Sequence, residues 1–317
     1  MGRRKSGRNV SGVILLNKPS DITSNAALQK VRRFFNANKA GHTGALDPLA
    51  TGLLPLCFGE ATKVSHFALE ADKTYQVVAQ LGQRTTTSDA EGELVEQCAP
   101  EQLTQLTRTH IDAAIAQFIG EQQQSPSMYS ALKHEGRPLY WYARQGIDVP
   151  RKTRTIYIRD IVFIDWTADQ LTLEVTCSKG TYIRTLIDDM GQVLGCGAFV
   201  NALHRTWIEG VEGRMYTLEE LSDIAAQTDP ENNDYAALDA LLQANDSVVL
   251  QMPAIAIAGP DIGRFLSGNP VAANAAEHDQ AQPIRVIRHT DNTFLGIGIW
   301  RNGQLAPKRV VNLDEAH

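Results

Sequence analysis

The stretch AGHTGALDPLATGLLPLCFGEATK, residues 40–63, holds one carboxylate, Asp47, in its glycine-punctuated first half. Gly44 and Gly52 flank this acid, Pro48 follows it directly, and the apolar run LLPLCF comes next. A proline ring disfavours the helical conformation for the preceding residue, so Asp47 is expected to be extended within a shaped loop. The stretch raises three roles for Asp47: turn residue, metal ligand or catalyst.

The neighbours of Asp47 narrow these roles without settling them. A metal site needs three or four ligands, and His42 and Asp47 supply only two. A glycosidase needs a second carboxylate within reach, for which Glu60 is the near candidate. An aspartyl nucleophile needs only exclusion of water and a cation that keeps it ionised. The alternative is that Asp47 caps the turn before Thr51 and Gly52. Both the turn and the catalyst stay open.

Composition is that of an ordinary globular chain. Its 317 residues are 43% hydrophobic and suffice for one large domain and a smaller one. No apolar run approaches the roughly 18–20 residues of a membrane span, and MGRRKSGRNVSG lacks the apolar core of a signal peptide. The four cysteines are never paired as CxxC, so we expect reduced thiols, no structural zinc and a cytoplasmic protein.

Charge is distributed unevenly along the chain. The net charge of −6 argues weakly against a nucleic-acid partner. Basic residues nevertheless crowd the first eight positions, and acids crowd 209–246. A basic face on an acidic protein is therefore compatible with the composition.

Periodicity predicts an α+β protein with a mixed, mainly antiparallel sheet. Residues 12–17 indicate a short buried strand, and 74–81 and 170–177 alternate as half-buried strands do. Ser24 is the predicted N-cap of a helix carrying Leu28, Val31 and Phe35. Further helices are predicted near 101–118, 136–145, 183–194 and 217–227. Strands and helices interleave without a regular βαβ rhythm.

A domain boundary is predicted within 228–247, where TDPENND is polar and rich in turn residues. Short apolar runs broken by Gly, Pro and Asn follow it and indicate a small β-rich module or barrel over 248–317. The predicted organisation is a basic tail over 1–9, a main domain over 10–247 and this C-terminal module.

The segment CSKGTYIRTLIDDMG, residues 177–191, predicts a helix with a strong apolar face. Arg184 lies in its first turn, where the helix dipole disfavours a cation. The placement indicates either a distant anionic partner or a solvated surface arginine. Thr181 can cap this helix, and Tyr182 is either a core residue or a stacking platform.

Residues 121–152 interleave cations with aromatic side chains. This pattern suits neutralisation of an RNA backbone and stacking on bases. It is equally compatible with a helix that packs its aromatics inward and leaves its cations in solvent. The cations are Lys133, His134, Arg137, Arg144, Arg151 and Lys152, and the aromatics are Tyr129, Tyr140, Trp141 and Tyr142. No phosphate-binding glycine loop and no HExxH motif occurs, so no cofactor or metal is expected.

Taken in order, five motifs closely resemble the bacterial TruB family of tRNA pseudouridine synthases. They are NKP (17–19), AGHTGALDPLATGLLPLCFGEATK, DKTYQVVAQLGQRTTTSDAEG (72–92), PSMYSALKHEGRPLY and CSKGTYIRTLIDDMG. The match covers about 10–215, and the tail resembles the PUA-type RNA-binding domain of that family. The resemblance implies isomerisation of uridine 55 in the tRNA T loop to pseudouridine without a cofactor, by an enzyme that is a monomer with no protein partner.

The same resemblance implies roles for individual residues. Asp47 matches the catalytic aspartate, and Arg184 matches the arginine that pairs with it. Tyr75 matches the tyrosine that stacks on the target base and is suited to removing its C5 proton. Tyr182 and Leu203 match other residues of the uracil pocket. His42 resembles the histidine that fills the space left by the flipped nucleotide.

The resemblance also implies that 121–152 is an insertion that grips the RNA loop. Lys133, Arg137, Arg144, Arg151 and Lys152 are its predicted RNA contacts, and Lys18 and Arg205 are predicted to assist. Lys18 with Pro19 is also expected to support the Asp47 loop.

The sequence departs from the family pattern at His204, which stands where a second arginine is expected.

Two competing hypotheses are a tRNA-folding chaperone that uses the same surface and a phosphate hydrolase with an aspartyl nucleophile. The hydrolase would need an acid where Leu49 stands.

Overall fold

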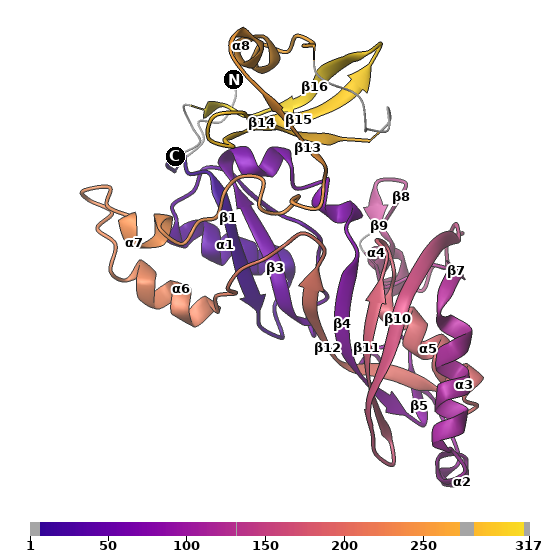
Figure 1. The fold of residues 1–317 in the computed structure, drawn as a ribbon. Helices are drawn as coiled ribbons and strands as arrows, with labels where there is room; N and C mark the ends of the chain where they lie inside the picture. The colour runs from indigo at the N-terminus through magenta and orange to yellow at the C-terminus, as the bar shows by residue number, and fades with distance from the viewer. Residues whose placement is uncertain (1–6, 131, 273–281, 314–317) are drawn as a thin grey trace. The chain divides into compact units, whose positions relative to one another are not determined.

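The computed structural model describes residues 7–130, 132–272 and 282–313 (Figure 1). Two compact units account for the chain. The first comprises Met1–Pro48, Gly52–Ala71 and Glu209–His317, and the second comprises Leu49–Thr51 and Asp72–Ile208. Within the described ranges, no helix is long and apolar enough to cross a bilayer.

The first unit is organised around β1 (Gly12–Lys18), which pairs antiparallel with β3 (Thr51–Phe58). The side chains of 13–16 are buried, which confirms the predicted strand. β2 (Ala40–His42) pairs with the far end of β3, and α1 (Ser24–Phe34) contributes Phe35 at its C-cap. The rings of Phe35 and Phe58 lie 4.9 Å apart in the core between them.

The helix cap of α1 differs from the prediction. Thr23, not Ser24, is the N-cap, and its hydroxyl accepts a hydrogen bond from Ala26 N at 3.1 Å. Ser24 is buried and bonds elsewhere. Serine is slightly preferred to threonine as an N-cap, so the tertiary bonds of Ser24 to Leu46 override the local preference.

Segment 209–250 belongs to the first unit. It includes α6 (Leu218–Ala225), which confirms the predicted helix, and α7 (Ala236–Asp239). Tyr216 and Gln243 form bridges with β1 at Leu16 and Val13. Asp239 forms a two-point ion pair with Arg8, whose guanidinium lies 4.1 Å from the ring centroid of Tyr235. The acidic segment therefore anchors the N-terminal region.

The C-terminal module contains one four-stranded sheet, β13-β14-β15-β16, and the helix α8 (Pro260–Leu266). The strands are Ala254–Ile257, Ile284–Arg288, Phe294–Arg301 and Gln304–Val310. β13 and β14 are parallel, and the other pairs are antiparallel. Phe265, Leu295 and Leu305 are fully buried in its core. The predicted β-rich module is confirmed as a sheet, whereas closure into a barrel stays a prediction.

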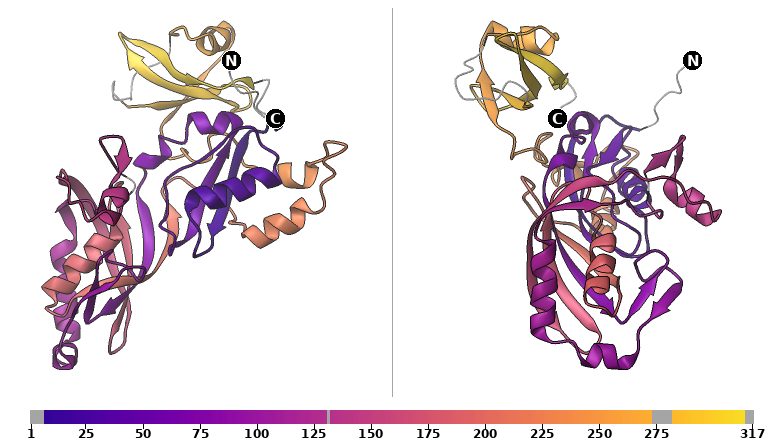
Figure 2. Two further views of the ribbon diagram at one scale, coloured as in Figure 1. Left: turned by 180° about the vertical axis from the view of Figure 1, so that it is seen from behind. Right: turned by 90° about the vertical axis from the view of Figure 1, so that its right-hand side faces the viewer.

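The second unit is an antiparallel sheet in the order β12-β4-β11-β10-β7, whose strands lie side by side in every view (Figure 2). The strands are Ala198–Ile208, Lys73–Leu81, Gln170–Cys177, Arg154–Trp166 and Gly120–Gln124. Leu171, Leu173, Val175 and Cys177 are buried along β11, as its alternation predicts. α5 (Ile183–Val193) packs on β12 and contacts α3 (Arg108–Phe118).

Two predicted helices of this unit are divided. The stretch near 101–118 forms α2 (Pro100–Thr104) and α3, because Thr107 caps a new helix through a hydrogen bond from His110 N. The stretch near 136–145 begins as β9 (Arg137–Pro138), which pairs with β8 (Lys133–His134), and only then continues as α4 (Leu139–Arg144). A further hairpin joins β5 (Gln83–Thr85) to β6 (Leu94–Gln97).

The four cysteines are free thiols, as predicted. Burial raises the pKa of both Cys57 and Cys177 to about 12. A raised pKa keeps these thiols protonated near neutral pH, and a protonated thiol is unreactive because the thiolate is the nucleophile. We expect iodoacetamide at about pH 8 to label half-exposed Cys98 in the native protein and to spare Cys57 and Cys177. Peptide mass spectrometry before and after unfolding checks this, and rapid native labelling of Cys57 would contradict it.

Candidate active site

In the first unit, hydrogen bonds to its main chain fix the Asp47 loop. The buried Ser24 hydroxyl accepts a hydrogen bond from Leu46 N at 2.8 Å and donates to Leu46 O at 3.0 Å. Gly44 adopts a φ of 107° and Gly52 a φ of 98°, which L side chains disfavour. Ser24 therefore fixes the residue before Asp47, and the glycines permit the bends on either side.

Lys18 supports the same loop from the end of β1. Its side chain is fully buried, and Nζ donates to the carbonyls of Pro19, Ile22 and Pro48 at 2.8, 2.7 and 3.1 Å. Pro48 directly follows Asp47, so this ammonium fixes the residue after the acid. The predicted loop-supporting role is confirmed. Lys18 is buried, so its charge is not accessible for the predicted contact with RNA.

Replacing Lys18 by methionine removes three charge-assisted hydrogen bonds and leaves carbonyls without that donor. We expect the free energy of unfolding to fall by about 2–4 kcal/mol, since each lost buried partner costs roughly 1–3 kcal/mol. Chemical denaturation measures this change. Lys30→Met, at an exposed position of α1, is the matched control and should change stability by less than about 0.5 kcal/mol. Equal stability of Lys18→Met and wild type would contradict the proposed support.

Tyr75 lies on β4 in the second unit, between two hydrogen-bonded neighbours. It is opposite Val175 of β11 and Arg205 of β12, and Val77 two residues on is opposite Leu203. Directly opposed residues share a face of the sheet. Tyr75, Leu203 and Arg205 therefore lie on one face, where Arg205 is only 1% exposed. Like Lys18, Arg205 offers no exposed charge to RNA.

Arg184 is a buried cation with several partners. It lies in the first turn of α5, and its NH1 donates to Asp89 Oδ2 at 3.0 Å and to Thr87 O at 3.2 Å. Its NH2 donates to Tyr129 O at 2.9 Å. The side chains of Arg184 and Asp89 are 5% and 3% exposed. The prediction of a distant anion is confirmed, and the alternative of a solvated arginine is wrong.

Asp89 is the buried partner of Arg184 that the sequence analysis missed. Besides Arg184, its carboxylate accepts hydrogen bonds from the Thr87 hydroxyl and from Glu91 N. The buried carboxylate of Asp89 therefore accepts several hydrogen bonds, as a buried charge requires. The sequence feature that could have indicated Asp89 is the polar run TTTSDAEG, which lies inside the TruB-like motif of 72–92. Solvent-exposed turns have the same composition, so the run alone does not predict a buried acid.

Tyr182 is the N-cap of α5, and the predicted capping by Thr181 is wrong. The Thr181 hydroxyl donates to Ser178 O instead. Among the described residues, no side chain caps this helix; the buried side chain of Gln124 holds the backbone of the N-cap residue, since Tyr182 N donates to Gln124 Oε1 at 2.7 Å and Gln124 Nε2 donates to Tyr182 O at 3.0 Å. The Arg154 guanidinium lies 4.6 Å from the ring centroid of Tyr182.

The two predicted histidines lie in different units. His42 ends β2 in the first unit, opposite Leu56, and is half-buried. His204 lies on β12, and its Nδ1 is 2.8 Å from the hydroxyl of Thr51. Asp47 and His42 thus belong to the first unit, while Tyr75, Tyr182, Arg184 and Leu203 belong to the second. The pairing of Asp47 with Arg184 stays a prediction.

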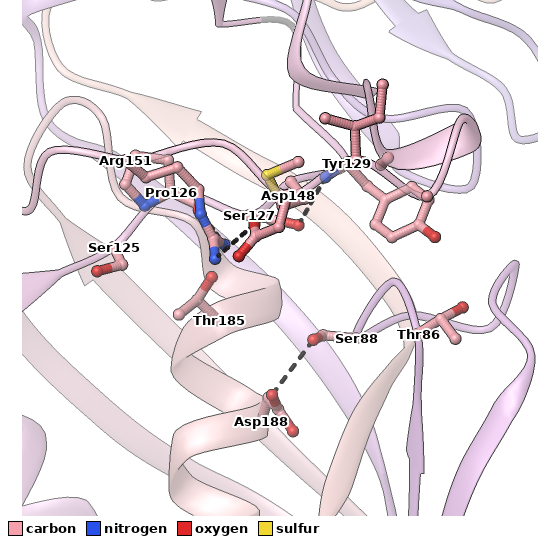
Figure 3. A pocket seen from close by; sticks show the side chains of 14 residues that line it. Thr86, Ser88, Ser125, Pro126, Ser127, Tyr129, Asp148, Arg151, Thr185 and Asp188 are labelled. Carbon is pink, nitrogen blue, oxygen red and sulfur yellow. Dashed lines mark hydrogen bonds and ion pairs between the residues drawn. The ribbon is translucent and has the colours of Figure 1, made fainter. Parts of the chain in front are cut away.

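An open cavity of about 450 Å³ adjoins the partners of Arg184 (Figure 3). Thr86 and Ser88 line one side, Thr185 and Asp188 of α5 line another, and the inserted segment completes it. Six of the fourteen lining residues carry hydroxyl groups, and the lining residue Arg151 donates to Pro126 O. The insertion and α5 therefore share one polar surface.

The cations predicted to contact RNA within the insertion are exposed. They are Lys133, Arg137, Arg144, Arg151 and Lys152. Arg137 lies 4.0 Å from the ring centroid of Trp141, and Tyr142 OH donates to His134 O at 3.1 Å. The aromatics thus fix the hairpin and α4 while the charges face outward. In the part of the chain that the structure describes, no three His, Cys, Asp or Glu side chains gather as a metal site.

Comparison with known proteins decides the family. Residues 32–183 match the TruB family pseudouridylate synthase N-terminal domain. Residues 184–250 match the tRNA pseudouridylate synthase B C-terminal domain, and 253–311 match the Pseudouridine synthase II TruB C-terminal domain. A tRNA pseudouridine synthase B of Idiomarina loihiensis is 52% identical over 311 residues, which cover 98% of this chain and 96% of that relative. The chain belongs to the TruB family.

Other TruB relatives agree with this assignment. A tRNA pseudouridine synthase B of Yersinia pestis is 50% identical over 317 residues, covering 98% of this chain and 95% of the relative. Among solved structures, a Cbf5-Nop10-Gar1 complex matches with a TM-score of 0.74 at 23% identity, covering 94% of this chain and 84% of that chain. An H/ACA RNP bound to a substrate RNA containing 2′-deoxyuridine matches with a TM-score of 0.73 at 20% identity, covering 100% and 93%. The predicted α+β fold and TruB resemblance are confirmed.

Proposed function

We propose that this TruB chain isomerises uridine 55 in the T loop of tRNA to pseudouridine. Near-full-length identity to enzymes named tRNA pseudouridine synthase B carries the proposal. The Asp47 loop, fixed on both sides of the acid, supports it, because a catalytic carboxylate needs a fixed position. In this proposal the substrate is the T stem-loop of tRNA, and the enzyme is a monomer that acts in the cytoplasm.

The reaction is balanced without a cofactor or metal. The C1′–N1 bond of uridine breaks, the uracil turns while it is held, and a C5–C1′ bond forms. The C5 proton leaves, and N1 gains one. Asp47 acts as an ionised carboxylate by attack at C1′, by addition to the uracil or by removal of a C2′ proton. All three routes need a carboxylate that Arg184 keeps charged.

The platform residues have distinct tasks in this proposal. Tyr75, flanked by hydrogen-bonded strands on both sides, is a rigid surface on which the target base stacks, and its phenolic oxygen, once deprotonated, accepts the C5 proton late in the reaction. Tyr182 and Leu203 line the uracil pocket. His42 fills the space left by the extruded nucleotide and offsets part of the few kcal/mol that extrusion costs.

The exposed cations of the insertion bind the phosphates of the T loop. Lys133, Arg137, Arg144, Arg151 and Lys152 carry this charge, and Lys18 and Arg205 are left out because they are buried. Arg137 stacked on Trp141 is prepositioned, which lowers the entropy lost on binding.

A T-arm transcript tests the proposal directly. The protein is incubated with the transcript, and pseudouridine is mapped at each uridine. We expect modification at position 55 alone, and a transcript with cytidine at that position should stay unmodified. Absence of pseudouridine, or its appearance at other uridines, would overturn the assignment.

A tRNA-folding activity through the same surface is the second candidate, and the outward cations of the insertion favour it. Folding of tRNA by a variant that cannot catalyse would demonstrate it. A variant that binds tRNA without changing the refolded fraction would exclude it.

A further inference from the structure

Two adjacent strands at the edge of the second unit's sheet hold Tyr182. β7 ends at Gln124 and β10 begins at Arg154, and these two residues are directly opposite each other in the antiparallel ladder. Directly opposed residues share a face of the sheet. Gln124 bonds the backbone of Tyr182, and the Arg154 guanidinium lies 4.6 Å from its ring centroid. A cross-strand pair therefore clamps the N-cap residue of α5.

Gln124 directs both polar groups of its carboxamide at one residue. Oε1 accepts from Tyr182 N at 2.7 Å, and Nε2 donates to Tyr182 O at 3.0 Å, beside the helical bond from Leu186 N to the same oxygen at 3.1 Å. The Gln124 side chain is only 4% exposed, so water competes little for these bonds. Gln124 thus fixes the direction in which the Tyr182 side chain leaves the main chain.

Arg154 lies against the ring of Tyr182. Among the described residues, its buried Nε and Nη2 have no hydrogen-bond partner. A desolvated guanidinium is attracted to the face of an aromatic ring. Gly180 leaves the room for this contact, because it has a φ of 77° and a Cβ there would lie 3.1 Å from Arg154 Nη1. The ring of Tyr182 is therefore fixed by a planar cation as its backbone is fixed by Gln124.

The same pair bounds the segment predicted to grip RNA. Between Gln124 and Arg154 the chain leaves the large sheet and forms β8, β9 and α4 before it returns. Within this segment, Tyr129 O accepts a hydrogen bond from Arg184. Both ends of the segment thus contact Tyr182, and one of its carbonyls binds Arg184. The insertion shares its support with the residues predicted to form the site.

We propose that Gln124 and Arg154 are positioning residues for the isomerisation, which hold Tyr182 in place at the uracil pocket. This inference rests on the proposed function, which assigns Tyr182 to that pocket. Neither residue has to touch the uridine, because each acts on Tyr182. A base that turns while it is held needs pocket residues that stay fixed during the turn. The two residues therefore affect the chemical step and not the affinity for tRNA.

Gln124→Met tests the backbone contact, because methionine keeps the volume and removes both polar groups. Gln123→Met, at the exposed neighbour on β7, is its matched control. Arg154→Lys tests the ring contact, since an ammonium keeps the charge but not the planar group. Arg159→Lys is the control for it, because Arg159 is exposed on the same strand and lies 4.5 Å from the ring centroid of Tyr157.

The single-turnover rate of pseudouridine formation and the Kd of tRNA are measured well below the unfolding temperature of each variant. We expect Gln124→Met to lower the rate about 10- to 100-fold, since misplacement by about 1 Å costs up to roughly 100-fold. Arg154→Lys should lower it about 5-fold. Both should keep the wild-type Kd, and both controls should keep the wild-type rate. A raised Kd with an unchanged rate would make the residue an RNA contact and overturn its positioning role.

The Tyr182→Ala background separates positioning from a general disturbance of the fold. If Gln124 and Arg154 act through the Tyr182 side chain, neither variant lowers the rate further in that background. A disturbance of the fold adds its own loss to that of Tyr182→Ala. Losses as large as those in the wild-type background would therefore overturn the inference.

Fluorotyrosine incorporated at position 182 gives a readout that needs no activity. We expect one narrow fluorine resonance in the wild type and in both controls, and a shifted or broadened resonance in Gln124→Met and Arg154→Lys. Identical resonances in all five proteins would show that neither residue holds Tyr182. If the wild type modifies no tRNA, the proposed function fails, and the resonance still reports whether Gln124 and Arg154 hold Tyr182.

Discussion

Asp47→Asn is expected to eliminate pseudouridine formation, with a fall in the single-turnover rate on the order of 10⁴ or more. Asparagine fills the same volume but cannot act as a nucleophile or a base, so each route through Asp47 is closed. The loop itself should be unchanged, because Ser24 and Lys18 hold the main chain on both sides of the acid. Binding of tRNA should therefore match that of the wild type.

Rapid-quench assays of preformed enzyme–tRNA complex measure the chemical step, and filter binding measures the Kd. Asp223→Asn, at an exposed position of α6, is the matched control and should retain full activity. A rate within about 10-fold of wild type in Asp47→Asn would exclude a role in bond making or breaking. A weaker Kd with an unchanged rate would make Asp47 a binding residue.

The parts of the fold that were predictable are those in which one side of an element is buried. Alternation over 170–177 and the apolar face of 183–194 correspond to β11 and α5, because burial of one face is recorded directly in the sequence. The division of 101–118 was missed because Thr107 was not recognised as the N-cap of a second helix, although threonine is a capping residue of low helix propensity.

The missed caps have a common physical cause. Ser24 and Thr181 are good capping residues, yet each bonds to another carbonyl; Thr23 caps α1 instead, and Gln124 holds the backbone of Tyr182 at the start of α5. Capping propensity reflects local competition among hydroxyls, whereas the choice here depends on Leu46 and on β7, which are distant in sequence. Local rules cannot resolve such a choice.

Burial of charged residues was the least predictable feature of the site. Lys18 and Arg205 resemble RNA contacts by type, but both are inside. Asp89 resembles a turn residue but is the buried partner of Arg184. A charge enters the interior only where specific groups surround it, and those groups come from separate parts of the chain. The anomalous position of Arg184 at a helix N-terminus was the one local sign of such a partner.

Arg184 joins three segments of the second unit. Through NH1 it binds the loop of Thr87 and Asp89, through NH2 it binds the carbonyl of Tyr129 within the insertion, and its backbone belongs to α5. A lysine keeps the positive charge but cannot reach several acceptors in the fixed fork of a guanidinium. Arg184→Lys therefore separates charge from geometry.

We expect Arg184→Lys to lower kcat by roughly 10²–10³, the effect of losing one preorganised donor, while the tRNA Kd stays unchanged. Asp89→Asn keeps the shape of the acid but removes its charge and should lower kcat by about 10-fold, since it acts through Arg184. Arg108→Lys, whose ion pair with Asp112 is exposed, is the control and should behave as wild type.

Stability has to be measured alongside these rates. Truncating one partner of a buried ion pair costs about 3–5 kcal/mol, which is why Arg184→Lys is preferred to alanine. If the double variant Arg184→Lys/Asp89→Asn is no slower than Arg184→Lys alone, the two residues act as one unit, as their 3.0 Å contact indicates. Additive losses would show that Asp89 acts independently of Arg184, and an unchanged kcat in Arg184→Lys would remove the guanidinium from the mechanism.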